Sequence, residues 1–311
     1  MDFKPLEGRE FPRFSGIKTF FRLPIAEPDA KFDVALFGIP FDGGASYRTG
    51  QRFAPTHIRE ASSLGRGYHW NRDLVYFKKL KVADVGDCPT VPIDLKQTYD
   101  RIEKFVYGLV KDGKKFIASG GDHSVTLPIL RALNKHYKKP IGLIHFDAHY
   151  DTYPPAWDCD FHHGTFARHA VTEKLIDPKK TVQIGIRGPF AVKEDSDFAS
   201  KHGFKVWTID EIRKRGVDAL VKEWPDFGDT PVYLSFDVDA MDPSCAPGTG
   251  TPVIGGLNSY EAQQFLRNLP KVNLVGGDVV EVIPQFDPAQ ITQLLAVDVM
   301  FEILSHMAAQ V

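Results

Sequence analysis

Six side chains of the kind that bind metal ions follow three short apolar segments of the chain. KFIASG leads into GGDH at 120–123, IGLIHF leads into DAHYD at 147–151, and VYLSF leads into DVD at 237–239. In an extended chain, side chains at positions i, i+2 and i+4 point to one face, so the members of each group can converge. The six candidate ligands are His123, Asp147, His149, Asp151, Asp237 and Asp239.

Four carboxylates in one place would repel one another and raise each other's pKa unless cations lie between them. Two divalent ions would balance the four negative charges. Two imidazoles and no thiolate point to a harder ion than that of a structural zinc site, with Mn²⁺ as the leading candidate. Two such ions about 3.5–4 Å apart can share a water molecule and lower its pKa. A lone His123 or a single DxD more often serves a turn, but three such strand ends together predict a metal site.

Eight short segments rich in β-branched and aromatic residues are predicted to be strands that are buried on both faces of a parallel sheet. They are Phe32–Gly38, Lys81–Val85, Lys115–Ser119, Ile141–Phe146, Val182–Ile186, Lys205–Thr208, Val232–Phe236 and Val272–Gly276. Amphipathic segments between them predict helices, the second of them with Ser124 as its N-cap. The helical segments are Leu95–Lys111, Ser124–His136, Ala191–His202, Ile209–Glu223, Ser259–Leu269 and Ala289–Ala308.

This alternation of strands and helices predicts one α/β domain over residues 1–311, with residues 1–30 as an N-terminal arm packed on it. The expected architecture is a three-layer α/β/α fold around a mostly parallel sheet of roughly eight strands. Ligands of open α/β sheets bind outside the carboxyl ends of the strands. The loops rich in Pro and Gly, at 38–50, 152–164 and 243–256, fall at those ends, beside the six candidate ligands.

The charge balance gives no electrostatic reason to expect nucleic acid or a membrane surface as a partner. Lys plus Arg numbers 38 and Asp plus Glu numbers 40, for a formal net charge of −2. Three cysteines without a CxxC spacing favour a reducing compartment over a disulfide framework. The chain shows neither a signal-peptide pattern at its start nor an apolar stretch of about 20 residues. We therefore expect a soluble cytoplasmic enzyme.

Six segments of the sequence resemble the motifs of the ureohydrolase (arginase/agmatinase) family. Three of them, GGDHS, HFDAHYD and SFDVDAMDPSCAPGTGTPVIGGL, are similar to the family's signatures. The segments VQIGIRG at Val182–Gly188 and VVEVIPQFD at Val279–Asp287 extend the likeness, as does IPFDGGASYRTGQRFAPTHIREAS. The resemblance covers nearly the whole chain and implies an arginase-like fold. It is strongest to agmatinase, guanidinobutyrase and guanidinopropionase members.

The resemblance assigns the six ligands to two manganese ions. Four residues would hold one ion, namely His123, Asp147, Asp151 and Asp237. Four would hold the other, namely Asp147, His149, Asp237 and Asp239, so that Asp147 and Asp237 bridge. A hydroxide shared by the two ions would attack the guanidinium carbon of a small guanidino substrate, and the tetrahedral species would collapse to urea and an amine. Nickel is the alternative metal for a member that cleaves guanidine itself.

Two further residues take catalytic roles by the same resemblance. Glu281 matches the glutamate that pairs with the guanidinium, a planar cation that suits a bidentate carboxylate; its simpler role would be to pair with a surface cation. His163, in FHHGTF, matches the histidine that passes a proton to the departing amine. His162 stands where the family usually has Ser or Thr, so it could share that duty. Asp122 and Thr249 are candidates for a supporting or substrate-side role, although either could simply cap a turn.

The segment that would meet the substrate tail departs from the family pattern. Tyr150 stands where a small or polar residue is usual, and the loop 152–161 is aromatic and contains two prolines. Arginase's signature for the amino-acid head group is not visible, which argues against arginine.

Three kinds of substrate tail remain open. A guanidino acid would need a cation for its tail carboxylate, whereas agmatine would need an acceptor for its ammonium group. A free or alkylated guanidine could be boxed by aromatic rings, although those rings could instead merely pack the loop. The candidates are His162, Arg48 and Arg168 for the carboxylate, Asp158 and Asp160 for the ammonium, and Tyr150, Tyr153 and Trp157 for the box.

Two other classes of function compete with urea release. One is a non-catalytic ureohydrolase-like subunit of a larger complex, although such proteins normally lose metal ligands and this chain keeps all six positions. The other is hydrolysis of a different C–N bond, such as a formimino group or an acetyl-lysine-type amide, against which Glu281 argues. The resemblance also implies a homo-oligomer, a trimer or a hexamer.

Overall fold

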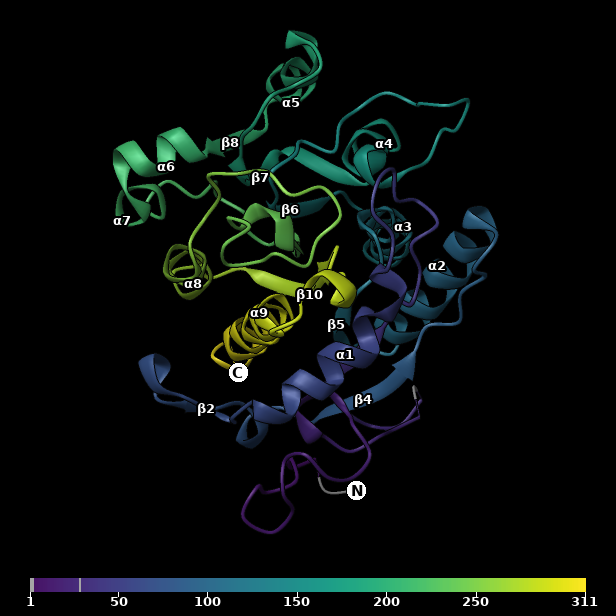
Figure 1. Ribbon diagram of the computed structural model, residues 1–311, viewed down its shortest axis with the longest axis vertical. Coiled ribbons are helices and arrows are strands. Elements are labelled where there is room, and N and C mark those ends of the chain that lie inside the picture. The colour runs from purple at the N-terminus through teal and green to yellow at the C-terminus, as the bar shows by residue number, and fades with distance from the viewer. Residues whose placement is uncertain (1–2, 28) are drawn as a thin grey trace.

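The computed structural model describes residues 3–27 and 29–311. Its centre is an eight-stranded sheet in the order β4-β1-β5-β10-β9-β6-β7-β8, with every neighbouring pair parallel (Figure 1). The strands are β1 (Val34–Gly38), β4 (Val82–Asp87), β5 (Lys115–Ser119), β6 (Ile141–Phe146), β7 (Ile176–Ile186), β8 (Lys205–Thr208), β9 (Pro231–Asp237) and β10 (Asn273–Val280). This confirms the predicted parallel sheet.

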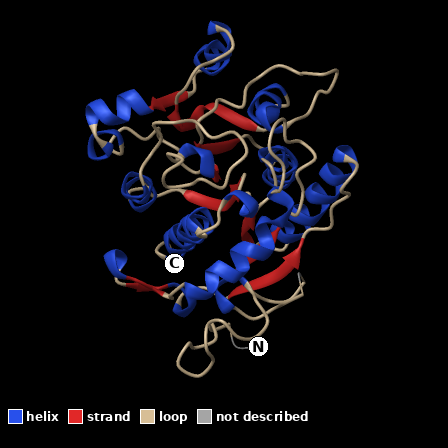
Figure 2. Ribbon diagram, viewed as in Figure 1, coloured by secondary structure: helices blue, strands red, loops and turns tan. Residues whose placement is uncertain are grey.

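Helices cover both faces of the sheet, as the colouring by element type in Figure 2 makes clear. Side chains from α1, α6, α7, α8 and α9 join one apolar cluster, and those from α2, α3, α4 and α5 join the other. Strand side chains alternate between the two clusters, as Leu36 and Phe37 of β1 do. The helices are α1 (Ala54–Ala61), α2 (Leu95–Lys111), α3 (Thr126–Tyr137), α4 (Phe166–Thr172), α5 (Asp197–His202), α6 (Ile209–Arg215), α7 (Val217–Leu220), α8 (Ser259–Arg267) and α9 (Ile291–Ala308). The three-layer α/β/α fold is therefore confirmed.

Strand β10 runs further than predicted, to Val280 rather than Gly276. The sequence GGD at 276–278 interrupts the apolar run. In the fold, Asp278 is buried inside the sheet because three hydroxyl groups, from Thr126, Tyr233 and Ser235, donate hydrogen bonds to it. The longer strand delivers Glu281 to the edge where the predicted ligands lie.

Several predicted helix boundaries were wrong. The 3₁₀ turn His123–Val125 precedes α3, and its N-cap is Asp122, whose carboxylate accepts a hydrogen bond from the backbone N–H of Ser124. The segment predicted as one helix over Ile209–Glu223 is divided at Gly216, where φ is 77°. Only the second half of Ala191–His202 is α-helical, after a 3₁₀ turn at Lys193–Ser196.

Other elements had no counterpart in the prediction. They are α1, α4 and a small antiparallel pair, β2 (Tyr68–His69) and β3 (Leu74–Val75). The expected N-terminal arm over 1–30 includes residues 1, 2 and 28, which lie outside the described residues. Within it, Phe20, Phe21 and Leu23 are buried in the same apolar cluster as α1.

Helix α9 is the one helix, among the described residues, that is long and apolar enough to cross a membrane by length and composition. Most of it, 78%, is buried inside the protein. It packs against α1, α8 and β10, which is the position of a core helix in a three-layer fold.

Candidate active site

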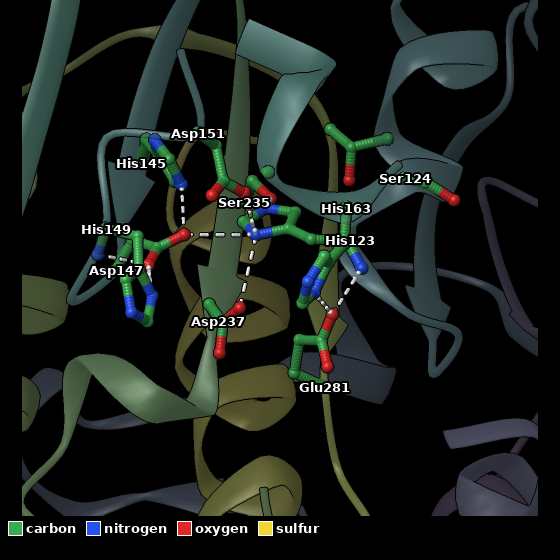
Figure 3. A network of polar contacts seen from close by, with 12 residues as sticks. His123, Ser124, His145, Asp147, His149, Asp151, His163, Ser235, Asp237 and Glu281 are labelled. Atoms are coloured by element: carbon green, nitrogen blue, oxygen red, sulfur yellow. Dashed lines mark hydrogen bonds and ion pairs between the residues drawn. The ribbon is translucent and has the colours of Figure 1, made fainter. Parts of the chain in front are cut away.

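The predicted ligands meet at the carboxyl ends of strands β5, β6 and β9, and Glu281 lies just beyond the end of β10. Because β5, β10, β9 and β6 are consecutive neighbours in the sheet, four strand ends deliver their side chains to one place (Figure 3). At the end of β5, Gly120 and Gly121 have φ of 83° and 89°, a conformation that glycine adopts without steric cost. This turn places His123 among the carboxylates of the other strands.

The first group of ligands surrounds His123. Its Nδ1 atom lies 3.1 Å from an oxygen of Asp147, 3.1 Å from an oxygen of Asp151 and 3.2 Å from an oxygen of Asp237. Within the described part of the chain, this buried nitrogen has no hydrogen-bond partner, although three oxygens stand around it. A nitrogen and three oxygens converging without hydrogen-bond geometry are the donor set of a divalent cation. The donor atoms of these four residues are therefore suited to binding one divalent ion.

The second group surrounds His149. Its Nδ1 atom lies 3.3 Å from Oδ1 of Asp147 and 3.1 Å from Oδ2 of Asp239. The other oxygen of Asp147, Oδ2, faces His123, so this carboxylate spans both groups. Asp237 turns Oδ2 to His123, while its Oδ1 accepts a hydrogen bond from the backbone N–H of Asp239. The structure thus brings all six predicted ligands together and places Asp147 between the two groups.

The electrostatics of the cluster call for additional positive charge. Burial, together with the charges of Asp239 and Asp147, raises the pKa of Asp237 well above its usual range. Burial and the charge of Asp147 raise the pKa of Asp239. The pKa of Asp147 is nevertheless held well below its usual range, because its close contacts with His123, His145 and His149 outweigh its burial. Bound cations would relieve the repulsion between these carboxylates.

His145 also belongs to the site, although the sequence analysis gave it no role. It is fully buried, and its Nε2 lies 2.8 Å from Oδ2 of Asp147. The Nε2 of Gln183 lies 3.0 Å from its Nδ1, and an amide NH₂ donates, so the proton of His145 sits on Nε2 and is donated to Asp147. The signal was present in the sequence, because His145 precedes Asp147 by two positions on β6 and shares its face.

A chain of hydrogen bonds supports His123 from behind. Its Nε2 lies 2.8 Å from the hydroxyl of Ser235, which donates in turn to Asp278 at 2.7 Å. Both supporting residues are fully buried. This arrangement fixes the proton of His123 on Nε2 and leaves Nδ1 free for a cation, as hydrogen bonds to the far nitrogen do in metal sites.

The predicted catalytic residues Glu281 and His163 form an ion pair. Nδ1 of His163 lies 3.0 Å from Oε1 of Glu281. Burial opposes the charge of His163, but the charge and hydrogen bond of Glu281 raise its pKa to about 9. Burial likewise opposes the ionisation of Glu281, but His163 lowers its pKa overall. At neutral pH the pair is therefore a charged imidazolium and a carboxylate.

Two residues that the sequence analysis did not single out hold this pair. Gln51 donates a hydrogen bond from Nε2 to Oε2 of Glu281 at 2.7 Å, and the hydroxyl of Ser46 lies 2.7 Å from Nε2 of His163. Both lie in the segment that resembles the family's N-terminal motif, but their spacing alone does not indicate what they touch.

A cavity of about 340 Å³ opens beside the metal-ligand cluster. Its lining includes the predicted residues Trp157, His162 and His163, together with Thr251, whose hydroxyl donates to Asp239 at 3.3 Å. The complete lining is Ser46, His149, Asp151, Tyr153, Trp157, His162, His163, Gly164, Pro189, Ala191, Asp237 and Thr251.

Three predicted substrate-binding residues do not line this cavity. Glu281 is buried and pairs with His163, which does line it. The ring of Tyr150 is buried in an apolar cluster and packs against Phe190, with 5.4 Å between the ring centres. Thr249 is buried, whereas Thr251, two positions later, lines the cavity. Asp122 accepts hydrogen bonds from the backbone N–H groups of Gly44 and Ser124, which is a turn-capping role.

Most of the predicted candidates for binding a charged substrate tail lie outside the cavity lining. Arg168 donates to the backbone oxygens of Thr152 and Tyr153 and so supports the loop from outside. Arg48 lies over the ring of Phe286, at 4.8 Å. Four candidates are not part of the lining, namely Arg48, Asp158, Asp160 and Arg168. Among the candidates for binding a charged tail, His162 is the one that lines the cavity.

A parallel α/β sheet whose strand ends gather four aspartates and two histidines beside a cavity defines a metal-dependent α/β hydrolase. The chain belongs to the arginase family, whose model matches residues 32–305. It is 45% identical to a guanidinopropionase of Pseudomonas aeruginosa, over 98% of this chain and 96% of that protein. It is 42% identical to an agmatinase of Cronobacter sakazakii, over 94% of this chain and 93% of the relative.

Solved structures give the same answer. The proclavaminate amidino hydrolase of Streptomyces clavuligerus superposes with a TM-score of 0.91 at 41% identity, covering 96% of this chain and 100% of that chain. A formiminoglutamase of Trypanosoma cruzi, solved with Mn²⁺, superposes with a TM-score of 0.80 at 25% identity, covering 91% and 95%. The protein is accordingly an enzyme, a metal-dependent hydrolase of non-peptide C–N bonds, which confirms that prediction.

Proposed function

We propose that this enzyme hydrolyses the guanidino group of a small linear ω-guanidino acid to urea and an amine. The observation that carries the proposal is the arrangement of the cavity. The metal-ligand cluster borders it, and the His163–Glu281 pair lies next to it. A guanidinium group needs a carboxylate partner, and its departing nitrogen needs a proton, and this pair offers both.

The six ligand residues would hold two divalent ions, with Asp147 as a bridge. The oxygen-rich donor set suits Mn²⁺, and Ni²⁺ is the alternative. When bound, the ions would supply a hydroxide nucleophile near neutral pH. His145 and Ser235 contribute by holding Asp147 and His123 in place through the hydrogen bonds described above.

Glu281 and His163 would act on the two ends of the bond that breaks. Glu281 accepts hydrogen bonds from the guanidinium N–H groups and so orients the guanidinium carbon. His163 carries a proton at neutral pH, because its pKa is about 9, and its Nδ1 gives that proton to the nitrogen of the departing amine. The arriving guanidinium competes with His163 for Glu281, which weakens the hold of the carboxylate on the proton when it is needed.

The outer part of the cavity favours an anionic substrate tail. The lining there consists of Tyr153, Trp157, His162, Pro189 and Ala191, none of which is acidic. Burial and the charge of His163 lower the pKa of His162, so His162 would meet a carboxylate as a neutral ring N–H donor. A carboxylate tail would find a partner in His162, while the ammonium of agmatine would find no acidic residue in that lining. Guanidinopropionase and guanidinobutyrase are also among the relatives, at 45% and 40% identity. Free guanidine is less favoured as the substrate, because Tyr150 is not part of the cavity lining and so cannot contribute to an aromatic site.

The reaction is tested by measuring urea and ammonia from metal-loaded protein supplied with 3-guanidinopropionate, 4-guanidinobutyrate, agmatine, arginine and guanidine. We expect urea from a guanidino acid. In the Asp147→Asn variant we expect turnover to fall by a factor of about 10³ or more, because a ligand shared by both metal groups is weakened. Ammonia without urea would indicate a formimino-type substrate and would refute the proposal. Near-normal turnover by Asp147→Asn would do the same.

The choice of tail is tested separately at His162. The variant His162→Ala should lower kcat/KM for guanidino acids by about tenfold, because it removes one charge-assisted hydrogen bond. The variant His162→Asp should lower it further and raise kcat/KM for agmatine. Trp157→Phe serves as a control for disturbance of the same cavity wall. An unchanged preference in both His162 variants would count against the assignment of this residue.

We also propose that the enzyme is a cytoplasmic homo-oligomer, a trimer or a hexamer. Large apolar side chains at the surface support association, including Phe14, Trp70 and Ile93, which are 85%, 80% and 96% exposed. Light scattering on the purified protein would give the mass of the assembly. A monomer at micromolar concentration would contradict the proposal.

A further inference from the structure

The loop between β1 and α1 touches both members of the His163–Glu281 pair. The hydroxyl of Ser46 contacts Nε2 of His163, the ring nitrogen that does not face Glu281. The amide of Gln51 contacts Oε2 of Glu281, the oxygen that does not face His163. The backbone oxygen of Gly44 also accepts a hydrogen bond from the N–H of His163 at 2.9 Å. One segment of eight residues, 44–51, thus holds the acid and the carboxylate from both sides.

The loop is itself fixed to the body of the protein. The N–H of Gly44 donates to Asp122 at 2.8 Å, and the N–H of Gly50 donates to Asp42 at 2.9 Å, while Asp42 pairs with Arg52. A side chain at position 44 would meet Ser124 and Asp122 at under 3 Å, so the backbone lies directly against the turn that carries His123. A loop held at both ends is suited to positioning other groups.

Gln51 is placed to fix the orientation of the Glu281 carboxylate. It is fully buried, and its Nε2 donates both to Glu281 and to the backbone oxygen of Arg48 at 3.1 Å. Glu281 itself has φ of 65°, a conformation that costs free energy for a residue with a side chain. A strained residue keeps its orientation only when its surroundings hold it, and Gln51 provides one of those contacts.

Ser46 is placed to hold His163 through a cycle of proton release and uptake. Because Nδ1 is the nitrogen that would release the proton, Nε2 keeps its own, and the Ser46 hydroxyl can accept a hydrogen bond from Nε2 in both charge states of the ring. Ser46 also lines the cavity, so it stands beside the space in which the reaction would take place.

We propose that Gln51 and Ser46 are positioning residues of the reaction, Gln51 acting through Glu281 on guanidinium binding and Ser46 acting through His163 on proton transfer. The inference rests on the proposed function and adds two residues to it. It assigns them different effects: Gln51 governs KM, and Ser46 governs kcat.

The test compares Gln51→Met and Ser46→Ala with the wild-type enzyme. Gln51→Met keeps the length of the side chain and removes the amide, so KM should rise by about 10–100-fold with kcat within about threefold. Ser46→Ala should lower kcat by about tenfold or more with little change in KM, and Ser46→Thr, which keeps the hydroxyl, should restore it. Thr49→Ala, an exposed position of the same loop, is the control and should match the wild type.

A binding measurement separates this inference from the reaction itself. Calorimetric titration with guanidinium chloride at low millimolar concentration reports the Glu281 subsite without turnover, and Gln51→Met should weaken that binding by about tenfold or more. If the wild-type enzyme binds guanidinium but releases no urea, the proposed function fails and the Gln51 assignment is still decided by this titration. Unchanged KM and guanidinium binding in Gln51→Met would overturn that assignment, and unchanged kcat in Ser46→Ala would overturn the other.

Discussion

At the scale of single residues, the ion pair with the buried carboxylate of Glu281 determines the charge of His163 at neutral pH. The charge of Glu281 raises the pKa of His163 to about 9, against an ordinary value of 6.5. The proton of a general acid must be present at the working pH and must leave when the reaction needs it. Pairing with the same carboxylate that would bind the substrate meets both needs, because the substrate competes for Glu281.

The ion pair gives a prediction about stability and pH in the metal-free protein. Because the folded-state pKa of His163 is raised, the stabilisation is fully present below pH 6.5 and is lost as the pH rises through about 9. Its full size is on the order of 3 kcal/mol. Chemical denaturation should show that Glu281→Gln is less stable than the wild type at pH 6, with the gap closing above pH 9.

The matched control for this prediction is the variant His163→Gln, alone and combined with Glu281→Gln. With the imidazole absent, the pH-dependent part of the gap should disappear. A gap that keeps its size from pH 6 to pH 10 would mean that the pair does not control the titration of His163.

The sequence was sufficient to predict that the six candidate ligands lie close together, because alternation along a strand places i and i+2 on one face. The same rule could have found His145 and Ser235, which precede Asp147 and Asp237 by two positions. The rule could not predict what the side chains of Gln51 and Tyr150 contact, because neither residue lies in a strand. Which side of a loop a residue faces depends on contacts with distant segments, such as Glu281 for Gln51 and Phe190 for Tyr150.

At the scale of elements, one arginine joins three segments behind the metal ligands. The guanidinium of Arg187, just after β7, donates to the backbone oxygens of Gly185, Asp239, Ala240, Met241 and Val253. The turn that carries Asp239 is therefore tied to the end of β7 and to the loop at 250–256. Such a fork of donors cannot be reproduced by a lysine.

This gives a prediction for the variant Arg187→Lys. Its free energy of unfolding should fall by about 1–3 kcal/mol, because several carbonyl groups lose their partner. Its affinity for divalent ions should fall by about 10–100-fold, as it does when groups that orient ligands are removed. Arg213→Lys is the control, since Arg213 pairs with Glu261 near the surface. Wild-type metal affinity in Arg187→Lys would contradict this account.

The packing of β10 against β9 gives a second prediction at this scale. A Cβ atom on Gly277 would lie 2.9 Å from the backbone oxygen of Leu234, which cannot move without parting the strands that carry Asp237 and Glu281. Gly277→Ala should therefore destabilise the protein by about 1–3 kcal/mol. Gly108 in α2 faces open space, so Gly108→Ala should stabilise by about 0.5–1 kcal/mol. Thermal denaturation should give a lower melting temperature for Gly277→Ala than for Gly108→Ala. Equal melting temperatures for the two variants would contradict this prediction.

The prediction of elements succeeded where hydrophobic runs are continuous and failed where a tertiary contact decides. All eight strands of the sheet overlap the predicted apolar runs, although β7 begins earlier than predicted, at Ile176 rather than Val182. Short α1 and α4, of eight and seven residues, carry too little periodic pattern to be separated from loops. The predicted end of β10, at Gly276, came too early, because the hydroxyl groups that allow Asp278 to be buried in the strand come from other elements.

At the scale of the whole molecule, the site depends on the complete sheet. Its ligands come from β5, β6 and β9, and Glu281 follows β10, so no local segment contains the site. Four carboxylates brought together by folding repel one another, and cations that bind only the folded form offset that repulsion. The fold and the metal centre should therefore stabilise each other.

Removal of metal tests this coupling. Treatment with a chelator should lower the melting temperature, and restoring Mn²⁺ should reverse the change, because ligand binding to the folded state alone stabilises it. Asp151→Asn, which weakens the His123 group of ligands, should reduce the size of the shift. A melting temperature that does not respond to chelation and re-addition would contradict a metal site in this place.

The most direct test of the central claim is a titration of metal-free protein with Mn²⁺, in which bound metal and urea released from 3-guanidinopropionate are measured in the same samples. We expect two ions to bind per chain and urea release to reach its maximum only when both sites are filled. Full activity without metal would contradict the account. So would two bound ions without urea release from any guanidino compound.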